Sequence, residues 1–455
     1  MPKVLYIGFG ISPATLGGAI IYQESLARKM RDRGWEVVCF FGARSDCNIK
    51  IQNKPYLKRR YKNGIKFIEL YNTPNEAGYF GDPARQCRDP YIDILTKRVL
   101  DEERPDIVHI QELQMHAASI IDIVCEAGYP VLKTMHNYFD ICPQRDLMFQ
   151  GRQLCLDFDH GQRCVDCLTV LPVKMVAPLA NRILRNFLPP RLYGYLSTLY
   201  KAHSPNITGQ KTCRTYRPDQ YAERRRFFVE KLNKLDIIHC SSRRSAEILA
   251  GYGVLKNRIK IIPLSVKSIE DIVPKPLRDN HYPVVFGYAG AKHLSRGYQV
   301  LMDAFAKLDQ KKAKLIMWGP AGLRSPDASL NIEARPRYDI AGINRAFEEI
   351  DVGIIPSIWE EIFGIVGIEW LAARIPVIGS NIGGIPDWLE DGETGFLVPA
   401  GDRDALAEKM RSFVNNPELI AELQKKIKRQ KTLDEHVDEL LGLYRDMCAK
   451  KKANV

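Results

Sequence analysis

Residues 351–398 decide the fold of this chain, and they read DVGIIPSIWEEIFGIVGIEWLAARIPVIGSNIGGIPDWLEDGETGFLV. The stretch begins with an apolar run that ends at Pro356-Ser357, which is typical of a buried parallel strand running into its loop. A second apolar run covers 375–379, and a helix is predicted between the two over 366–373. Strand, helix and strand in this order predict a βαβ unit of a parallel sheet.

Two carboxylates stand on either side of a tight turn in this stretch. Glu361 precedes the turn at Phe363-Gly364, and Glu369 lies in the helix that follows. The backbone N–H groups of Gly364 and Ile365 would then stand at a helix N-terminus, where an anion binds well. An elongated ligand with a phosphate at this helix end and hydroxyl groups on both sides of it would fit the spacing of the two carboxylates. The alternative is that Glu361 is a loop charge and Glu369 belongs to a solvated helix face.

This pattern resembles the donor site of a known family. The residues that carry the resemblance are Glu361-IFGIVGI-Glu369, Pro356-Ser357 before it, and Gly383-Gly384-Ile385-Pro386-Asp387 after it. Together they resemble the signature of the retaining nucleotide-sugar glycosyltransferases of family 4 (glycosyl transferases group 1), which have the GT-B architecture. The resemblance implies an α/β fold with two Rossmann-like doubly wound domains that face each other across a cleft.

Length and composition agree with a globular protein of more than one domain. The chain has 455 residues and a net charge of +12, and chains of this length usually divide into two or three domains. No stretch approaches the roughly 20 apolar residues of a membrane span. The N-terminus enters a strand without the features of a secretory signal, so a cytoplasmic location is expected.

The N-terminal part begins with a strand–helix–strand unit of its own. Residues 4–10 and 36–41 are predicted strands, and Gly17-Gly18 and a helix over 20–33 lie between them. A second doubly wound sheet is therefore expected. The resemblance implies that Gly17 and Gly18 belong to a glycine-rich loop facing the donor phosphates, whereas an ordinary turn is the alternative explanation.

Two histidines stand at the carboxyl ends of predicted strands, the edge at which open α/β sheets bind ligands. His109 belongs to the strand at 105–110, and His136 follows the strand at 131–135. Each could be a hydrogen-bonded structural residue. The resemblance implies that His136 faces the donor sugar, whereas His109 occupies a position that is more often structural.

A cysteine-rich loop follows His136. Its four cysteines follow one another at intervals of thirteen, nine and three positions: Cys142, Cys155, Cys164 and Cys167. Two residues therefore lie between the last two cysteines. This pattern is typical of a tetrathiolate metal site, and metal could hold together a loop that has no core of its own. Structural zinc is the first choice and an iron–sulfur cluster the second, while free thiols or disulfides remain alternatives. The resemblance implies a structural role on the acceptor side of the cleft.

The most basic part of the chain is 170–232, where twelve Lys and Arg residues stand against three acids. Basic amphipathic helices of this type lie on anionic membranes, so a peripheral position on the inner face of the cell membrane is one expectation. Packing of ordinary helices against the N-terminal domain is the alternative. Arg224-Arg225-Arg226 is expected to extend the basic surface. No RNA-binding signature accompanies it, so no nucleic acid partner is expected.

The second domain supplies the cations of the predicted donor site. A strand at 284–289 runs into a loop with Lys292 and Arg296 and then a helix over 298–308. The resemblance implies two cations here that clamp the donor diphosphate. Arg296 stands where the family has a lysine, and Ala291 stands where it has an arginine, with Lys292 beside it. Arginine can hold a phosphate through two hydrogen bonds, so Arg296 would keep the clamp.

Three segments are predicted on this basis: an acceptor domain at 1–270, a donor domain at 271–432, and a helix within 433–455 that returns to the first domain. The resemblance implies a retaining glycosyltransferase of hexosyltransferase type that moves a sugar from a nucleotide diphosphate to an acceptor hydroxyl. Surface polysaccharide, lipid-linked glycan and glycosylated metabolites are the products of such enzymes. The rival prediction is a catalytically degenerate protein that binds nucleotide sugars or tethers a complex to the membrane.

The resemblance also assigns the roles of single residues. Catalytic roles fall to His136, Glu361 and Arg296. No catalytic metal is expected, because no Asp-x-Asp follows a predicted strand. The residues expected to bind the nucleotide-sugar donor come from both domains: Gly17, Gly18, Lys292, Arg296, Glu361, Phe363, Gly364, Ile365 and Glu369.

Overall fold

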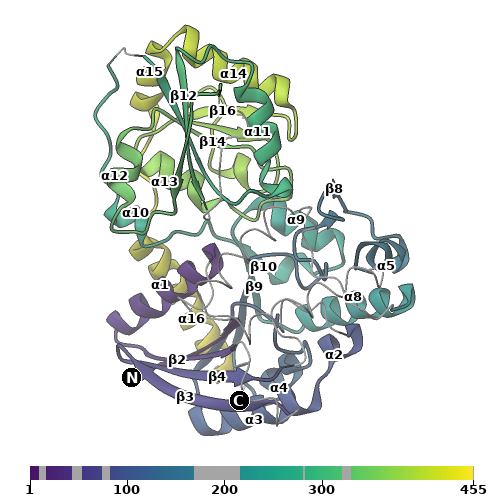
Figure 1. The fold of residues 1–455 in the computed structure, drawn as a ribbon. Coiled ribbons are helices and arrows are strands. Elements are labelled where there is room, and N and C mark those ends of the chain that lie inside the picture. The colour runs from purple at the N-terminus through teal and green to yellow at the C-terminus, as the bar shows by residue number, and fades with distance from the viewer. Residues whose placement is uncertain are drawn as a thin grey trace, which may run out of the picture.

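The computed structural model describes residues 1–9, 17–43, 54–73, 82–168, 216–279, 282–319 and 329–453. They form two lobes, each built on one large sheet (Figure 1). We call the lobe around the eight-stranded sheet the N-lobe and the lobe around the six-stranded sheet the C-lobe. The prediction of two doubly wound α/β domains is confirmed.

The N-lobe sheet has the strand order β10-β9-β6-β5-β1-β2-β4-β3. All neighbouring strands are parallel except β3, which pairs antiparallel with β4 at the edge. The strands are β1 (Lys3–Phe9), β2 (Glu36–Gly42), β3 (Tyr56–Lys62), β4 (Ile65–Tyr71), β5 (Ile107–Ile110), β6 (Val131–Thr134), β9 (Ile237–Cys240) and β10 (Ile259–Ile261). The helices are α1 (Gly18–Asp32), α2 (Pro83–Cys87), α3 (Pro90–Glu103), α4 (Ile120–Glu126), α5 (Gln162–Leu168), α8 (Pro218–Leu232) and α9 (Arg243–Gly251).

The C-lobe sheet is parallel throughout and has the order β13-β12-β11-β14-β15-β16. Its strands are β11 (Val284–Ala289), β12 (Ala313–Gly319), β13 (Ile332–Pro336), β14 (Val352–Ile355), β15 (Val377–Ser380) and β16 (Gly395–Val398). The helices near it are α10 (Ser268–Asp271), α11 (Tyr298–Phe305), α12 (Ile343–Glu348), α13 (Ile365–Ala372), α14 (Arg403–Asn415) and α15 (Glu418–Lys426). Every residue of β14 and β15 is buried, as expected for strands covered on both faces.

A buried tryptophan sets the distance between α13 and the C-lobe sheet. The Trp370 side chain is fully buried and packs on the Phe347 ring, with 4.2 Å between ring centroids. A Cβ atom added at Gly353 of β14 would lie 2.6 Å from the indole, and one at Gly287 of β11 would lie 3.0 Å from it. Because both positions are glycine, α13 can lie close enough to bring its first turn to the edge of the sheet.

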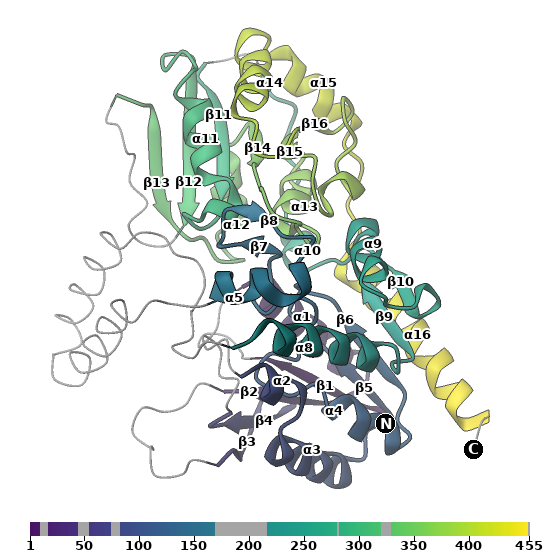
Figure 2. The same cartoon turned by 90° about the vertical axis from the view of Figure 1, so that its right-hand side faces the viewer.

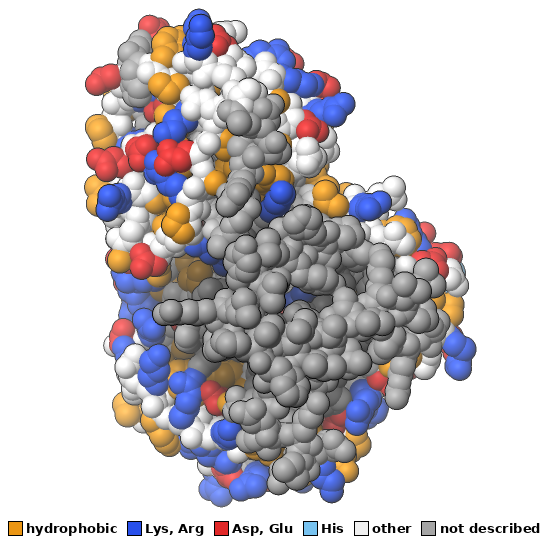
Figure 3. Space-filling model, in the orientation of Figure 1, with side chains coloured by type: hydrophobic (Ala, Val, Ile, Leu, Met, Phe, Trp, Pro, Cys, Tyr) orange, Lys and Arg blue, Asp and Glu red, His pale blue; other side chains and the backbone are white. Residues whose placement is uncertain are grey.

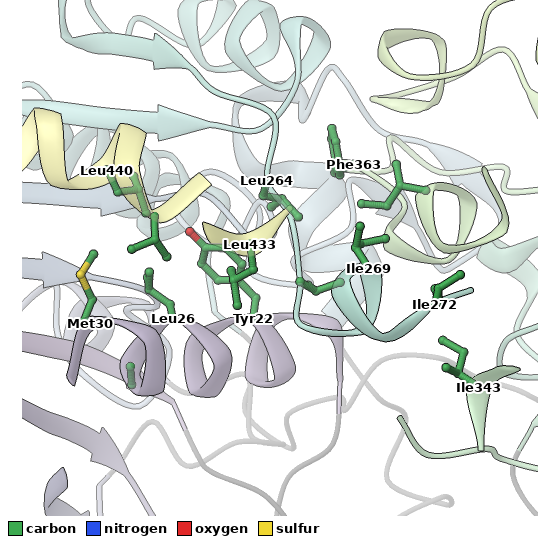
Figure 4. Close-up of a cluster of buried hydrophobic side chains, with 14 of the residues drawn as sticks. Tyr22, Leu26, Met30, Leu264, Ile269, Ile272, Ile343, Phe363, Leu433 and Leu440 are labelled. Carbon is green, nitrogen blue, oxygen red and sulfur yellow. The ribbon is translucent and has the colours of Figure 1, made fainter. Parts of the chain in front are cut away.

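The long helix α16 (Leu433–Ala453) follows the C-lobe in sequence but packs on α1 of the N-lobe (Figures 1 and 2). Leu433 and Leu440 contribute to the same apolar cluster as Leu26 of α1 and, farther along, Phe363 of the C-lobe (Figure 4). One continuous core thus joins α1, α16, the linker and the C-lobe. Burial of this much apolar surface favours a fixed arrangement of the two lobes.

Polar contacts of α16 reach the middle of the N-lobe sheet. The Tyr444 hydroxyl is 2.6 Å from Nδ1 of His109, and Nε2 of His109 is 2.7 Å from the Thr134 hydroxyl. His436 Nε2 is 2.8 Å from the Tyr22 hydroxyl. Burial holds the pKa of His109 and of His436 well below the usual histidine value, so both rings are neutral. His109 therefore belongs to a buried hydrogen-bond network, which indicates a structural role.

The expectation that Arg224 and Arg225 extend a basic surface is wrong. The two arginine side chains, which belong to α8, are buried. The Arg224 guanidinium donates to the Phe139 carbonyl at 2.7 Å and lies 4.2 Å from the Phe228 ring centroid, and Arg225 donates to the Ile141 carbonyl at 2.7 Å. Both arginines therefore fasten the backbone that follows His136. Residues 170–215, which make up most of the basic segment, lie outside the described residues.

Positive and negative side chains are mixed on the described surface. On the face seen in Figure 3, basic and acidic side chains are interspersed over the described parts of both lobes. Among the described helices, none has the length and apolar character that crossing a bilayer requires.

Candidate donor site

The first turn of α13 forms the floor of the predicted site. Gly364 precedes the helix with a φ of 89°, a left-handed conformation that favours glycine, and no described side chain caps this end. The first backbone N–H groups of α13 are thus left for a ligand. Trp388 lies over this turn: its indole nitrogen donates to the Phe363 carbonyl at 2.5 Å, and a Cβ at Gly367 would lie 2.0 Å from its ring.

Glu361 is held beside this turn by three donors. Its carboxylate accepts hydrogen bonds from the Trp359 indole at 2.8 Å and from the Ser357 hydroxyl at 3.1 Å. Nη1 of Arg296 lies 2.6 Å and 2.9 Å from its two oxygens. The Glu361 side chain is 8 % exposed and that of Arg296 is 44 % exposed. The guanidinium can therefore bind a ligand while the carboxylate keeps it in place. This direct pairing is not indicated by the sequence, in which the two residues are far apart.

The two predicted cations have different surroundings. Arg296 ends a short turn (Leu294–Arg296) before Gly297, and His293 Nδ1 accepts the Ser295 N–H at 3.2 Å at its start. Lys292 is exposed, and its ammonium lies 5.4 Å from the Tyr298 ring centroid. Arg296 is therefore paired with Glu361, whereas Lys292 lies at the exposed rim of the predicted donor site.

Glu369 stands in the second turn of α13, with its carboxyl turned inward. The Ser268 hydroxyl of α10 donates to it at 2.5 Å. Desolvation by burial raises the pKa of Glu369 to about 7, although the Ser268 hydrogen bond works in the opposite direction. The carboxyl is consequently close to half ionised at neutral pH. Phe363, by contrast, directs its ring into the apolar core between the lobes (Figure 4), so its side chain has a packing role.

The N-lobe closes over this floor from the opposite side. A Cβ added at Gly18, the first residue of α1, would lie 3.1 Å from Cδ1 of Ile365, the first residue of α13. The N-termini of the two helices thus meet, and Gly17 precedes α1 without a neighbour within 4 Å of an added Cβ. The glycine pair predicted to face the donor is therefore brought to the helix end predicted to bind it.

His136 follows β6 on the same side of the N-lobe. Its Nε2 is 2.7 Å from the side-chain oxygen of Gln111, and its ring centroid lies 5.1 Å from that of Tyr22. Desolvation, with a contribution from Lys133, lowers the pKa of His136 to about 3. The imidazole is thus neutral near pH 7 and offers hydrogen bonding without a charge.

Contacts between the lobes border the site, and no pattern in the sequence indicates them. Arg244 of α9 holds Glu360 of the C-lobe through Nη2 at 2.7 Å and Nε at 3.1 Å. The neighbouring Arg243 contacts Asp387 through its backbone N–H at 2.6 Å and through Nε at 3.1 Å. Glu360 directly precedes Glu361, so the N-lobe takes part in placing the donor-site loop.

The prediction of a metal-binding cysteine loop is not supported. No three His, Cys, Asp or Glu side chains in the described ranges are grouped in a way that could hold a metal ion. The sulfur of Cys167 instead accepts the Gln150 N–H at 3.0 Å, and Cys164 packs with Tyr221 in a small apolar cluster. All four predicted ligands are free cysteines: Cys142, Cys155, Cys164 and Cys167.

Comparison with known sequences points to the same part of the chain. Residues 283–416 match the family model described as glycosyl transferases group 1. The D-inositol 3-phosphate glycosyltransferase of Streptomyces avermitilis is 33 % identical over 144 residues, which cover 29 % of this chain and 30 % of the relative. The phosphatidyl-myo-inositol mannosyltransferase of Mycobacterium leprae is 36 % identical over 128 residues, 27 % and 34 % of the two chains. The chain thus spans about a third of the length of these relatives.

Solved structures resemble the whole chain. Sucrose-phosphate synthase from Thermosynechococcus elongatus superposes with a TM-score of 0.65 at 18 % identity, covering 99 % of this chain and 100 % of that one. Anabaena HepE in complex with UDP and glucose gives 0.59 at 15 % identity, covering 97 % and 100 %. The predicted GT-B fold is confirmed by these matches. Residues 283–416 are therefore a glycosyl transferases group 1 domain, set in a chain whose two α/β lobes have the GT-B fold.

Proposed function

We propose that this protein is a retaining glycosyltransferase that moves a hexose from a nucleotide diphosphate to an acceptor hydroxyl. The observation that carries the proposal is the Arg296–Glu361 pair beside the uncapped N-terminus of α13, within the segment that matches the family. An exposed guanidinium and free backbone N–H groups suit a diphosphate, and a neighbouring carboxylate suits sugar hydroxyls.

In the proposed complex the diphosphate lies between Arg296 and the first turn of α13. Glu361 accepts hydrogen bonds from the donor sugar, Glu369 from the ribose, and Lys292 adds positive charge at the rim. Gly17 and Gly18 let the N-lobe backbone approach the phosphates. The neutral His136 bonds a sugar hydroxyl from the opposite side, as its pKa of about 3 permits.

The chemical step follows from this placement. The bond between the anomeric carbon and the diphosphate oxygen breaks, and the acceptor oxygen bonds to that carbon from the same face. The hydroxyl proton passes to the departing phosphate oxygen. Negative charge grows on the diphosphate as it leaves, so Arg296 and the α13 amides contribute most by stabilising that charge. Nucleotide sugars with UDP, GDP or ADP are the donors to test, and surface glycans, lipid-linked glycans and metabolites are the acceptor classes.

Release of nucleoside diphosphate from a donor panel tests the proposal. We expect the wild type to release it from at least one UDP-, GDP- or ADP-sugar. Glu361→Ala should reduce kcat/KM by about ten- to a hundredfold, because a charged hydrogen-bond acceptor to the sugar is lost. Glu390→Ala, which removes an exposed carboxylate of the same lobe, is the matched control and should behave like the wild type. Binding of a nucleotide sugar without release from any donor would instead indicate a binding protein.

Proton release on nucleotide binding tests the role of Glu369. Its pKa of about 7 leaves it about half protonated at pH 7, and ribose hydroxyls favour the ionised form. Binding of nucleoside diphosphate should therefore release about half a proton at pH 7, and affinity should fall as the pH drops below 7. Calorimetry in two buffers of different ionisation enthalpy measures this release. The same measurement on Glu369→Gln gives the proton release that comes from the phosphate groups of the ligand. Equal proton release by the wild type and Glu369→Gln would contradict the proposed role of Glu369.

A further inference from the structure

A chain of buried hydrogen bonds crosses the N-lobe sheet and ends at His136. It begins at a backbone carbonyl just after β10 and passes through β9, β6 and the end of β5, which are neighbouring strands of the sheet. Its members, in order, are the Ile262 carbonyl and the side chains of His239, Thr134, His109, Gln111 and His136. The first four of these side chains are at most 1 % exposed, so their polar atoms need partners within the protein.

The first links fix the positions of two hydrogen atoms. Nε2 of His239 lies 2.7 Å from the Ile262 carbonyl oxygen, which can only accept, so this nitrogen carries the hydrogen. Burial lowers the pKa of His239 to about 4, so the ring is neutral and Nδ1 has no hydrogen. The Thr134 hydroxyl, 3.0 Å from this Nδ1, therefore donates to it. Tyr22 also hydrogen-bonds Thr134, but its hydroxyl brings a hydrogen of its own.

The orientation of the Thr134 hydroxyl determines the tautomer of His109. Because the one hydroxyl hydrogen of Thr134 points to His239, its oxygen accepts at the contact with Nε2 of His109, 2.7 Å away. Nε2 of His109 therefore carries the hydrogen. The ring is neutral, so its Nδ1 accepts from the Tyr444 hydroxyl of α16 at 2.6 Å. Both ring nitrogens of His109 thus have a partner of the opposite kind.

Gln111 connects His109 to His136 through the two ends of its side-chain amide. One end lies 3.1 Å from Nε2 of His109, and the other lies 2.7 Å from Nε2 of His136. The oxygen and the NH2 group have nearly the same shape, so hydrogen bonding decides which end is which. An oxygen toward His136 would leave the NH2 group facing the N–H of His109, donor against donor. The oxygen is therefore the end toward His109, and the NH2 group donates to His136.

The Gln111 amide thereby sets the tautomer of His136. Nε2 of His136 accepts the amide hydrogen, so in the neutral ring Nδ1 carries the proton. No described residue forms a hydrogen bond with this Nδ1, and the side chain is partly exposed. The ring lies against Tyr22, one turn after Gly18 on α1, and Gly18 is the residue that meets Ile365 of α13. The N–H group of His136 is thus available to a ligand near the two helix ends of the candidate donor site.

We propose that Gln111 is a positioning residue of the donor site, which holds His136 as the Nδ1–H tautomer so that the ring donates a hydrogen bond to an oxygen of the donor sugar. This proposal rests on the proposed function. In this tautomer the nitrogen left to the ligand has no free lone pair, so His136 cannot take the proton of the acceptor hydroxyl. That proton passes to the departing diphosphate instead, which agrees with the proposed chemical step.

The tautomer of His136 can be measured directly by solid-state NMR on protein that is isotope-labelled in its nine histidines. Protonated and unprotonated imidazole nitrogens resonate in separate ranges, and correlations to the ring carbons distinguish Nδ1 from Nε2. The signals that disappear in His136→Asn belong to His136. We expect a protonated Nδ1 and an unprotonated Nε2 at neutral pH. A protonated Nε2, or an even mixture of the two tautomers, would overturn the assignment.

Two variants of Thr134 test whether the tautomer is transmitted along the chain of hydrogen bonds. Thr134→Val has nearly the same shape but lacks the hydroxyl, so Nε2 of His109 loses the acceptor that fixes its hydrogen. The Gln111 amide can then turn over, and we expect both tautomers of His136 to appear. Thr134→Ser keeps the hydroxyl and should keep the wild-type tautomer, and thermal melts verify that both variants fold. An unchanged tautomer in Thr134→Val would overturn the role of this chain.

Gln111→Met tests the role of Gln111 in donor binding. It removes both ends of the amide, so we expect KM for the nucleotide sugar to rise about tenfold through the loss of one oriented hydrogen bond. The Kd of the free nucleoside diphosphate, which has no sugar, should stay within about twofold. Equal weakening of both would indicate a structural defect and overturn the proposal. If the wild type releases nucleoside diphosphate from no donor, the proposed function fails, whereas the NMR spectra still decide the tautomer.

Discussion

Replacing Arg296 with alanine is expected to lower kcat/KM for donor turnover by about a hundred- to a thousandfold. Arg296 is the cation that the structure brings to Glu361, 2.6 Å from its nearer oxygen, and it remains accessible to a ligand. Loss of a single group that stabilises charge developing in the transition state typically costs this much. Steady-state release of nucleoside diphosphate from the preferred donor measures the effect.

Lys292→Ala is the matched control, because it removes a cation from the same loop. Its ammonium lies over the Tyr298 ring, so we expect a loss of less than about tenfold, typical of a charge at the rim. Arg296→Lys should fall between the two, since a lysine keeps the charge but loses the geometry of the guanidinium. A loss below tenfold in Arg296→Ala, or an equal loss in Lys292→Ala, would show that the diphosphate is stabilised elsewhere.

The largest loss of stability is expected from Gly297→Ala. Gly297 has a φ of 68°, and a Cβ atom there would lie 1.6 Å from the Pro356 carbonyl oxygen. The carbonyl oxygen belongs to the backbone and the position of a Cβ is fixed by the backbone of residue 297, so the clash can be relieved only by moving the turn at Arg296 away from the end of β14. We expect the free energy of unfolding of the C-lobe to fall by at least about 3 kcal/mol, measured by denaturant unfolding followed through tryptophan fluorescence.

Gly392→Ala separates the backbone conformation from the clash. Gly392 has a φ of 75°, but nothing lies within 4 Å of an added Cβ. Only the cost of the left-handed conformation remains there, about 1–2 kcal/mol. If both variants lost the same free energy of unfolding, the close approach of Gly297 to Pro356 would have no energetic importance.

The sequence predicted the local structure of the donor site well, because that structure follows from periodicity. The apolar run at 375–379 became β15 (Val377–Ser380), and the helix expected at 366–373 is α13 (Ile365–Ala372). Buried parallel strands and a glycine turn leave a signal within a few residues. The position of His136 at a strand end was predicted by the same means, whereas its role, and the boundary near residue 270, stay predictions.

Contacts between distant residues could not be predicted in this way. Arg244 and Glu360 are 116 positions apart, and nothing in either neighbourhood marks them as partners. Arg224 and Arg225 were assigned to the surface because arginine is usually exposed, yet aromatic rings and backbone carbonyls enclose them. The cysteine spacing was misleading for a related reason: spacing along the chain does not specify where the sulfur atoms point.

The position of α16 has a consequence for how the chain is made. Its residues 433–453 leave the ribosome after the whole C-lobe sheet, yet Leu433, Leu440 and Tyr444 fill the space beside α1. The lobe that is synthesised first therefore has an open flank during most of translation, while the lobe synthesised second can close its core earlier. Domains generally fold as units in the order of synthesis. In this chain the N-lobe is synthesised first, but its core is completed last.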